Sequence, residues 1–178
     1  MRVVSGSARG TRLFTPDGLE FRPTLDRVKE AVFSMLTGKS YENVLDLFSG
    51  SGAVGIESLS MGAESCTFVD KSRHSLSVTQ KNLDKTHLLD KAQIVLSDYE
   101  SFIKKNTKKF DLVFLDPPYR EGLLFTALCL LKEKSLSDGA TVVCEMDDKL
   151  KCEIPEGYLA VRDKKYGRCR VFVLEKNF

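Results

Sequence analysis

Residues 44–55 read VLDLFSGSGAVG, a mostly apolar run that leads into a turn rich in glycine. Val44 to Phe48 has the composition of a buried strand, and the residues from about Ala53 to Gly62 have that of a helix. Glycines at this passage let the backbone come close to a ligand, while the start of the helix offers unpaired N–H groups. The stretch therefore predicts a strand, a ligand-binding turn and a helix; the alternative is a tight turn that binds nothing.

Strand-like and helix-like segments alternate after Asn43. We expect further strands at 66–70, 93–96, 111–116 and 140–145, separated by helices at 72–85, 97–105 and 123–132. The last two strands, 158–163 and 169–174, are predicted to form a hairpin around residues 164–168. The prediction is an α/β fold with a mostly parallel seven-stranded sheet, a C-terminal antiparallel hairpin and helices on both faces.

The length of 178 residues suits one domain. We divide it into an irregular or hairpin-forming basic arm (1–23), a leading helix (24–37) and an α/β core (43–178). The predicted N-caps of three helices are Thr24, Ser72 and Ser97, the last as part of the capping box Ser97-Asp98-Tyr99-Glu100.

The composition is that of a soluble globular protein, with 42% hydrophobic and 29% charged residues. The sequence starts without the apolar run of a secretory signal, and its apolar stretches are too short to span a membrane. The five cysteines are scattered, without a C-x-x-C pair, and there are two histidines. We expect a cytoplasmic monomer with reduced thiols, no membrane contact and no metal site.

The net charge of +2 conceals a segregation of charge along the chain. Residues 1–29 carry a net charge of +3 and residues 161–178 of +4, whereas residues 30–160 carry −5. If both basic ends lie on one face, they could bind a polyanion. The alternative is two solvated surface segments.

Acidic residues follow three successive strands, and they bear on the kind of cofactor. Asp46 lies at the first strand, Asp70 ends the second and Asp98 follows the third. Asp70 has the spacing of an acid that binds ribose hydroxyls. Asp46 is poorly placed beside a pyrophosphate but suits the ammonium of S-adenosylmethionine, and Asp98 could accept from the adenine amine. Alternatively, Asp46 accepts hydrogen bonds from nearby loop amides, and Asp98 is a residue of the first helical turn that the helix dipole favours.

The acids and their neighbours together form the predicted cofactor site. Its members are Asp46, Phe48, Ser49, Gly50, Gly52, Asp70, Lys71, Asp98 and Tyr99.

The segment VFLDPPY, residues 113–119, drives a strand into a carboxylate and two prolines. Each proline restricts the residue before it to extended conformations and lacks an N–H, so Asp116-Pro117-Pro118 is a stiff turn rich in acceptors. Two acceptors can hold the hydrogens of a planar nucleobase amine and direct the nitrogen lone pair at a methyl group, while Tyr119 stacks on the base. Positioning and electrostatics suffice for such a methyl transfer.

The motifs DLFSGSG (46–52) and DPPY (116–119) resemble those of nucleic-acid amino-methyltransferases with an Asp/Asn-Pro-Pro-aromatic turn. With SGSARGTRL (5–13) and RPTLDRVKEAVFSML (22–36), the resemblance narrows to the RsmD-type methyltransferases, which modify the N2 amine of a guanine in small-subunit (16S) ribosomal RNA.

This resemblance implies a Rossmann-like methyltransferase fold, S-adenosylmethionine in the glycine turn and a guanine held by residues 116–119. It also implies that Arg9, Arg12, Arg22 and Arg27 contact RNA. From charge alone we add Arg120, Lys164 and Lys165 to the predicted RNA contacts. The expected partner is ribosomal RNA within a small-subunit assembly particle, with the target base flipped out of its stack.

Three other functions are open at this point. The same chemistry could act on adenine N6 in DNA or RNA, although no separate sequence-reading domain is visible. A nicotinamide oxidoreductase could use the same glycines, but no Tyr-x-x-x-Lys motif or well-placed histidine accompanies them. A non-catalytic RNA-binding module would leave the Asp-Pro-Pro turn unexplained.

Overall fold

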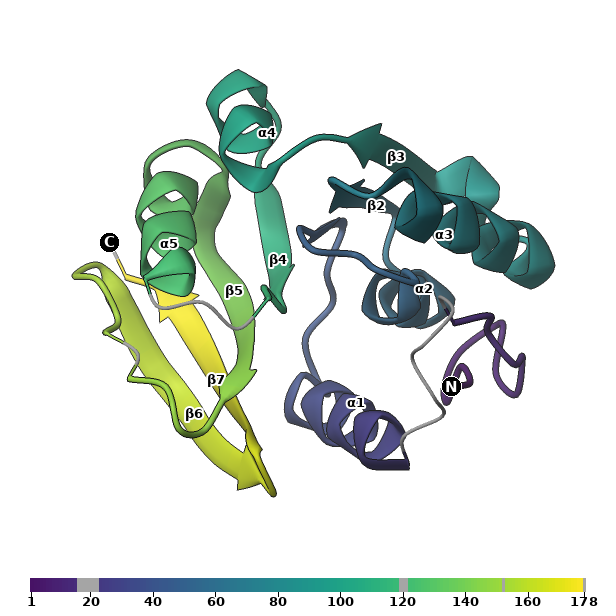
Figure 1. The fold of residues 1–178 in the computed structure, drawn as a ribbon, viewed down its shortest axis with the longest axis horizontal. Coiled ribbons are helices and arrows are strands. Elements are labelled where there is room, and N and C mark those ends of the chain that lie inside the picture. The colour runs from purple at the N-terminus through teal and green to yellow at the C-terminus, as the bar shows by residue number, and fades with distance from the viewer. Residues whose placement is uncertain (16–22, 119–121, 152, 178) are drawn as a thin grey trace.

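A computed structural model describes residues 1–15, 23–118, 122–151 and 153–177. It contains a seven-stranded sheet of order β3-β2-β1-β4-β5-β7-β6 (Figure 1). Strands β1 to β5 pair in parallel, whereas β7 runs antiparallel to both β5 and β6. The strands are β1 (Asn43–Asp46), β2 (Ser65–Asp70), β3 (Ala92–Leu96), β4 (Phe110–Leu115), β5 (Leu136–Asp147), β6 (Tyr158–Tyr166) and β7 (Cys169–Lys176). The predicted sheet architecture is confirmed.

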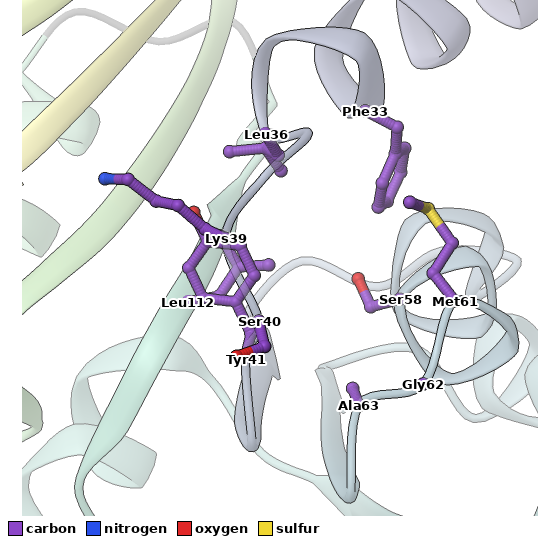
Figure 2. A pocket seen from close by; sticks show the side chains of 10 residues that line it. All are labelled: Phe33, Leu36, Lys39, Ser40, Tyr41, Ser58, Met61, Gly62, Ala63 and Leu112. Carbon is purple, nitrogen blue, oxygen red and sulfur yellow. The ribbon is translucent and has the colours of Figure 1, made fainter.

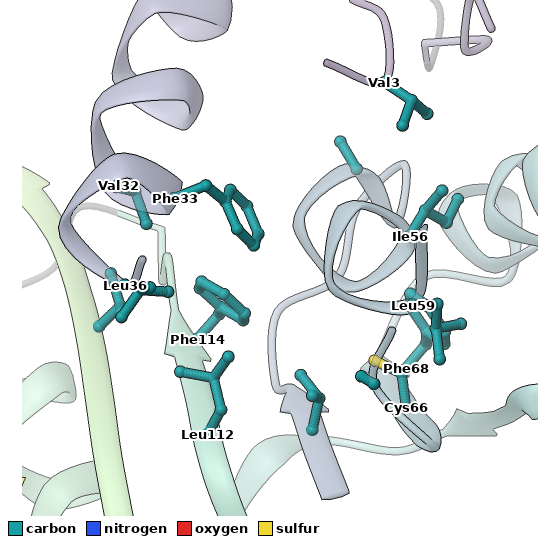
Figure 3. Close-up of a cluster of buried hydrophobic side chains, with 14 of the residues drawn as sticks. Val3, Val32, Phe33, Leu36, Ile56, Leu59, Cys66, Phe68, Leu112 and Phe114 are labelled. Carbon is teal, nitrogen blue, oxygen red and sulfur yellow. The ribbon is translucent and has the colours of Figure 1, made fainter. Parts of the chain in front are cut away.

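Helices cover both faces of the sheet, because its strands alternate apolar side chains between the two faces. Phe114 packs with α1, α2 and α3 on one face (Figure 3), whereas its neighbour Leu115 packs with α4 and α5 on the other. Phe33 of α1 meets Phe114 with ring centroids 5.6 Å apart. The helices are α1 (Pro23–Met35), α2 (Ala53–Ser60), α3 (Arg73–Thr86), α4 (Tyr99–Lys105) and α5 (Leu123–Lys134), with a 3-10 turn η1 at Leu89–Lys91.

Several predicted boundaries are wrong, each for a local reason. Strand β1 ends at Asp46, two residues before the predicted end at Phe48, because the chain turns away so that the amide of Ser49 donates to the Val69 carbonyl at 3.0 Å. Strand β5 begins at Leu136 rather than Ala140 and is irregular where it pairs with β4.

The C-terminal hairpin has a shorter loop than predicted. Tyr166 pairs with Cys169, so only Gly167 and Arg168 connect the strands. Lys164 and Lys165, predicted in the loop, belong to β6. The C-terminal hairpin lies at one edge of the sheet, away from residues 1–15 of the N-terminal arm (Figure 1).

The predicted helix starts are confirmed in part. The Ser72 side chain accepts from the Ser75 amide at 3.2 Å and caps α3 as expected. Helix α4 is capped by Asp98, which accepts from the Ser101 amide at 2.9 Å, so Ser97 is not the cap. Helix α1 begins at Pro23, one residue before the predicted cap Thr24.

The arm begins as a small hairpin. Arg2 and Arg12 form an antiparallel bridge, flanked by a bond from the Val3 amide to the Thr11 carbonyl at 3.0 Å. The hairpin packs on α2, where the Ser7 amide donates to the Ser60 carbonyl at 2.8 Å and the Ala8 amide to the Ser60 hydroxyl at 2.9 Å.

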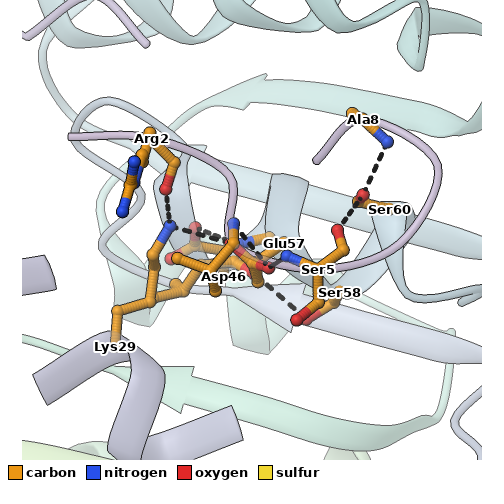
Figure 4. Close-up of polar contacts among 11 residues, drawn as sticks. Arg2, Ser5, Ala8, Lys29, Asp46, Glu57, Ser58 and Ser60 are labelled. Carbon is orange, nitrogen blue, oxygen red and sulfur yellow. Dashed lines mark hydrogen bonds and ion pairs between the residues drawn. The ribbon is translucent and has the colours of Figure 1, made fainter. Parts of the chain in front are cut away.

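A buried carboxylate joins this hairpin to α1 and α2 (Figure 4). Glu57 of α2 is 0% exposed and accepts from Lys29 Nζ of α1 at 2.8 Å. It also accepts from the amides of Val4 and Ser5, at 3.0 and 2.7 Å. Lys29 in turn donates to the Arg2 carbonyl. Because the donors come from the hairpin and from α1, whereas Glu57 belongs to α2, the ion pair fixes the relative positions of three segments.

Glycine 6 makes the docking of the hairpin testable. It has φ of +75°, and a Cβ there would lie 1.7 Å from the Ser60 carbonyl oxygen; Gly10 has φ of +87° but nothing within 4 Å. We expect Gly10→Ala to lower the free energy of unfolding by about 1–2 kcal/mol, through backbone conformation alone. Gly6→Ala must also displace the hairpin from α2 and should cost about 3 kcal/mol or more in equilibrium urea unfolding. Equal losses would contradict the docked hairpin.

Candidate active site

The glycine turn after β1 is held from behind by α3. Thr79 Oγ1 donates to the Gly50 carbonyl at 3.0 Å, and Asn82 Nδ2 donates to the Ser51 carbonyl at 2.9 Å. The carbonyls of the turn therefore face α3. The turn leads into α2, whose first position is preceded by Gly52 without a side-chain cap.

The glycines of the turn meet different requirements. Gly50 has φ of +54° and a Cβ there would meet nothing within 4 Å, so open space adjoins the backbone. A Cβ on Gly55 would lie 2.3 Å from the Phe68 ring, so that glycine permits α2 to pack closely on β2. Only the first of these leaves room for a ligand.

Asp46 is a buried acid at the end of β1. Its side chain is 3% exposed and accepts from the Gly55 amide at 3.3 Å. Burial, opposed by this hydrogen bond and reinforced by the nearby charge of Asp70, raises the pKa of Asp46 to about 7. No salt bridge among the described residues includes it. The bond from the Gly55 amide agrees with the alternative predicted for Asp46, whereas its contact with a cofactor ammonium stays a prediction.

Asp70 ends β2 and organises the loops on either side of the site. It accepts from the Gly50 amide at 2.9 Å and from the Ser72 amide at 2.8 Å. Lys71, next to it, is exposed. Ser49 is buried, and its hydroxyl has no hydrogen-bond partner within the described part of the chain.

The end of β3 adds a polar and an aromatic residue. Asp98 is exposed, and hydrogen bonds from the Ser101 amide lower its pKa, as expected of an acid that caps a helix. The ring of Tyr99 meets that of Phe48 with centroids 5.6 Å apart, which connects the start of α4 to the end of β1.

The Asp116-Pro117-Pro118 turn follows β4, which lies beside β1. Asp116 is accessible to solvent, whereas Pro117 is buried. Surrounding protein nevertheless raises the pKa of Asp116 well above its ordinary value, with further contributions from Glu145 and Asp46. Asp46 is in register with Phe114, so Asp116, two residues beyond Phe114, lies just past the end of β1. Tyr119 and Arg120 lie outside the described residues.

The sequence analysis missed Glu145. Leu115 is in register with Cys144, so the residues that follow them, Asp116 and Glu145, are neighbours on adjacent strands. Burial raises the pKa of Glu145, while the Cys169 thiol bonds to its Oε1 at 3.1 Å. The available signal was an acid at the end of an apolar strand, the same signal that identified Asp70 and Asp116.

The predicted RNA-binding residues are spread over the surface. Arg9 and Arg12 are exposed on the N-terminal hairpin, and Arg27 is exposed on α1. Lys164 is exposed on β6, and Lys165 beside it pairs with Asp148. Arg22 lies outside the described residues.

A pocket of about 130 Å³ lies elsewhere, at the amino ends of β1 and β2 (Figure 2). Its walls are mainly apolar and contain none of the acids at the opposite ends of the strands. Its lining residues are Phe33, Leu36, Lys39, Ser40, Tyr41, Ser58, Met61, Gly62, Ala63 and Leu112. Ligand sites in open α/β sheets lie at the carboxyl ends of the strands, so we take the acids and the glycine turn at these ends as the candidate site.

Comparison with known proteins identifies the family. The model of the family described as Conserved hypothetical protein 95 matches residues 1–175. The chain belongs to this family. Family members named as ribosomal RNA small subunit methyltransferase D are among the relatives, which confirms the RsmD-type resemblance.

The relatives are similar over most of their length. The chain is 37% identical to the candidate ribosomal RNA methyltransferase YlbH of Bacillus subtilis, covering 99% of each. It is 36% identical to ribosomal RNA small subunit methyltransferase D of Escherichia coli, covering 83% of this chain and 75% of the relative. Among solved structures, the candidate methyltransferase yhhF of Escherichia coli gives a TM-score of 0.87 at 32% identity, covering 99% of this chain and 98% of the other.

Membrane-spanning helices and clusters of metal ligands are absent from the described residues. No helix there is both long and apolar enough to cross a membrane. No three histidine, cysteine or acidic side chains in the described ranges are grouped so as to hold a metal ion.

The raised pKa of Asp46 predicts how stability depends on pH. Between the ordinary value of 3.8 and about 7, the folded protein holds a proton that the unfolded chain releases, so the free energy of unfolding falls as pH rises to about 7. Asparagine does not ionise, so it does not lose stability in this way. Without ligand, Asp46→Asn should therefore raise the melting temperature relative to wild type more at about pH 8 than at about pH 5. The reverse trend would mean that the charged form is stabilised in the fold.

Proposed function

We propose that the chain is an S-adenosylmethionine-dependent methyltransferase that modifies the exocyclic N2 amine of a guanine in small-subunit ribosomal RNA. One observation carries the proposal: the stiff Asp-Pro-Pro turn follows β4 at the same edge of the sheet where the adjacent strand β1, which ends at the buried Asp46, runs into the glycine turn. The family membership supports it, because the named relatives are ribosomal RNA methyltransferases. We treat residues 1–178 as one such domain.

The residues at the carboxyl ends of the strands and in the glycine turn fit S-adenosylmethionine better than a dinucleotide. Asp46 is buried without a described ion pair, so an ammonium group would neutralise it, whereas a pyrophosphate would add to its repulsion. Asp70 would accept from the ribose hydroxyls, and Asp98 and Tyr99 would border the adenine. The open space at Gly50 would let the ligand lie against the protein backbone. When bound, the cofactor supplies an electrophilic methyl group on a sulfonium.

Asp116 would act on the amine. Its carboxylate and the Pro117 carbonyl would accept the two N–H hydrogens, which holds the nitrogen with its lone pair toward the methyl group. As the N–C bond forms and the S–C bond breaks, the nitrogen gains positive charge and must lose one proton. Surrounding protein and Glu145 raise the pKa of Asp116, so its carboxylate is a better proton acceptor than an ordinary aspartate.

Tyr119 would stack on the guanine, and Arg9, Arg12 and Arg27 would contact phosphates.

The decisive experiment is mass mapping of modified nucleosides in ribosomal RNA from cells with and without this protein. Loss of an N2-methylguanine in small-subunit RNA supports the proposal. Loss of N6-methyladenine instead would favour the alternative substrate.

The cofactor can be tested by ligand-induced stabilisation. A ligand present at about 100 times its dissociation constant stabilises the folded state by about 2.7 kcal/mol. Adenosylmethionine should therefore raise the melting temperature of the wild type and of the surface control Asp138→Asn, but much less that of Asp46→Asn. A rise with NAD and none with adenosylmethionine would contradict the assignment.

The role of Asp116 predicts a separation of binding from turnover. Asp116→Ala removes an acceptor and a proton acceptor, so tritium transfer from adenosylmethionine to ribosomal RNA should fall by about 100-fold or more. RNA affinity should stay within about twofold, since phosphate contacts supply most of it. Asp90→Ala, at an exposed acid of η1, is the control for both measurements. Near-normal transfer by Asp116→Ala would rule out the assigned role.

A further inference from the structure

The N-terminal hairpin ends in an aromatic residue that is fixed in place yet half exposed. Phe14 has 50% of its surface exposed. Its amide donates to Asn82 Oδ1 at 2.7 Å, and its carbonyl accepts from Asn82 Nδ2 at 3.0 Å. Asn82 of α3 is 0% exposed. Both backbone groups of Phe14 are thus held by a buried side chain, and the ring is presented to solvent on a rigid support.

The ring of Phe14 has cationic surroundings. Lys85 of α3 places its Nζ 4.6 Å from the ring centroid, a cation–π contact that covers one face of the ring. Arg12, two residues before Phe14, is also exposed, whereas Leu13 between them is buried. Lys81 is exposed one helical turn before Lys85. Asp84 is an acid of the same helix, so these described residues comprise three cations and one anion.

The same asparagine connects this surface to the candidate active site. Asn82 Nδ2 donates both to the Phe14 carbonyl and to the Ser51 carbonyl of the glycine turn. The aromatic ring is therefore one side chain away from the turn that would hold the cofactor, on the side where α3 covers it.

We propose that Phe14, with Arg12, Lys81 and Lys85, forms a stacking surface for an unpaired base of the RNA, distinct from the base that is methylated. An exposed aromatic beside cations suits single-stranded RNA, because the ring stacks on any base while the cations contact the flanking phosphates. An apolar protein partner would not be served by the Lys85 ammonium over the ring. This inference rests on the proposed function, since it takes the substrate to be RNA.

The test separates stacking from charge by the salt dependence of binding. We would measure the affinity for a small-subunit ribosomal RNA fragment over a range of salt concentrations for Phe14→Leu, Phe14→Tyr and Lys85→Gln. Phe14→Leu should weaken binding roughly 10-fold at every salt concentration, leaving the slope of log affinity against log salt unchanged. Phe14→Tyr should restore binding, and Lys85→Gln should reduce the slope by about one.

The matched control is Phe125→Leu, at a phenylalanine of α5 that is 39% exposed and has no cation over its ring among the described contacts. Equal affinity of Phe14→Leu and Phe125→Leu, with normal methyl transfer by the wild type, would overturn this inference alone. Failure of the wild type to methylate ribosomal RNA would overturn the proposed function as well. A loss seen only with assembled particles, and not with naked RNA, would identify a protein partner instead and also overturn the stacking surface.

Discussion

The buried pair of Glu57 and Lys29 is the interaction on which the arrangement of the site depends. A charge without water is costly unless it is fully compensated, and Glu57 is compensated by one ammonium and two backbone amides. Those donors come from the hairpin and from α1, while Glu57 itself belongs to α2. Because α2 starts at the glycine turn, the pair also fixes where that turn lies relative to the sheet and to the arm.

Glu57 and Asp46 are both buried acids, but they differ in whether a cation of the protein neutralises them. Both are buried acids, 0% and 3% exposed, but only Glu57 has a described cationic partner. The pKa of Asp46 is raised to about 7, and that of Asp116 is raised as well. Acids at neighbouring strand ends that have no described cationic partner repel one another when charged. A cationic ligand would therefore reduce an electrostatic repulsion that is already present in the fold.

The sequence predicts the layout of the sheet because long apolar runs bounded by glycine or an acid can be recognised locally. Its errors arise where apolar residues serve another purpose: Phe48 is apolar because it packs on Tyr99, and not because it continues β1. The acids at the carboxyl ends of their strands or just beyond lie as predicted, namely Asp46, Asp70, Asp98 and Asp116. Glu145 of β5 carries the same local signal but was not selected. The hydrogen bonds of Glu57 and Asn82 reach across 53 and 68 positions, which no local pattern reveals.

Helix α3 links the two surfaces that a nucleic-acid methyltransferase must coordinate. Thr79 holds Gly50, and Asn82 holds Ser51 and Phe14 with one amide. Leaving a buried hydrogen-bonding group unpaired costs about 1–3 kcal/mol, so the turn and the end of the hairpin cannot shift independently without such a loss. A ligand that fixes either one therefore restricts the other, and by linkage the effect is mutual. The described part of the arm, residues 1–15, is thus hydrogen-bonded to the same helix as the turn, although residues 16–49 lie between Thr15 and Gly50 in the sequence.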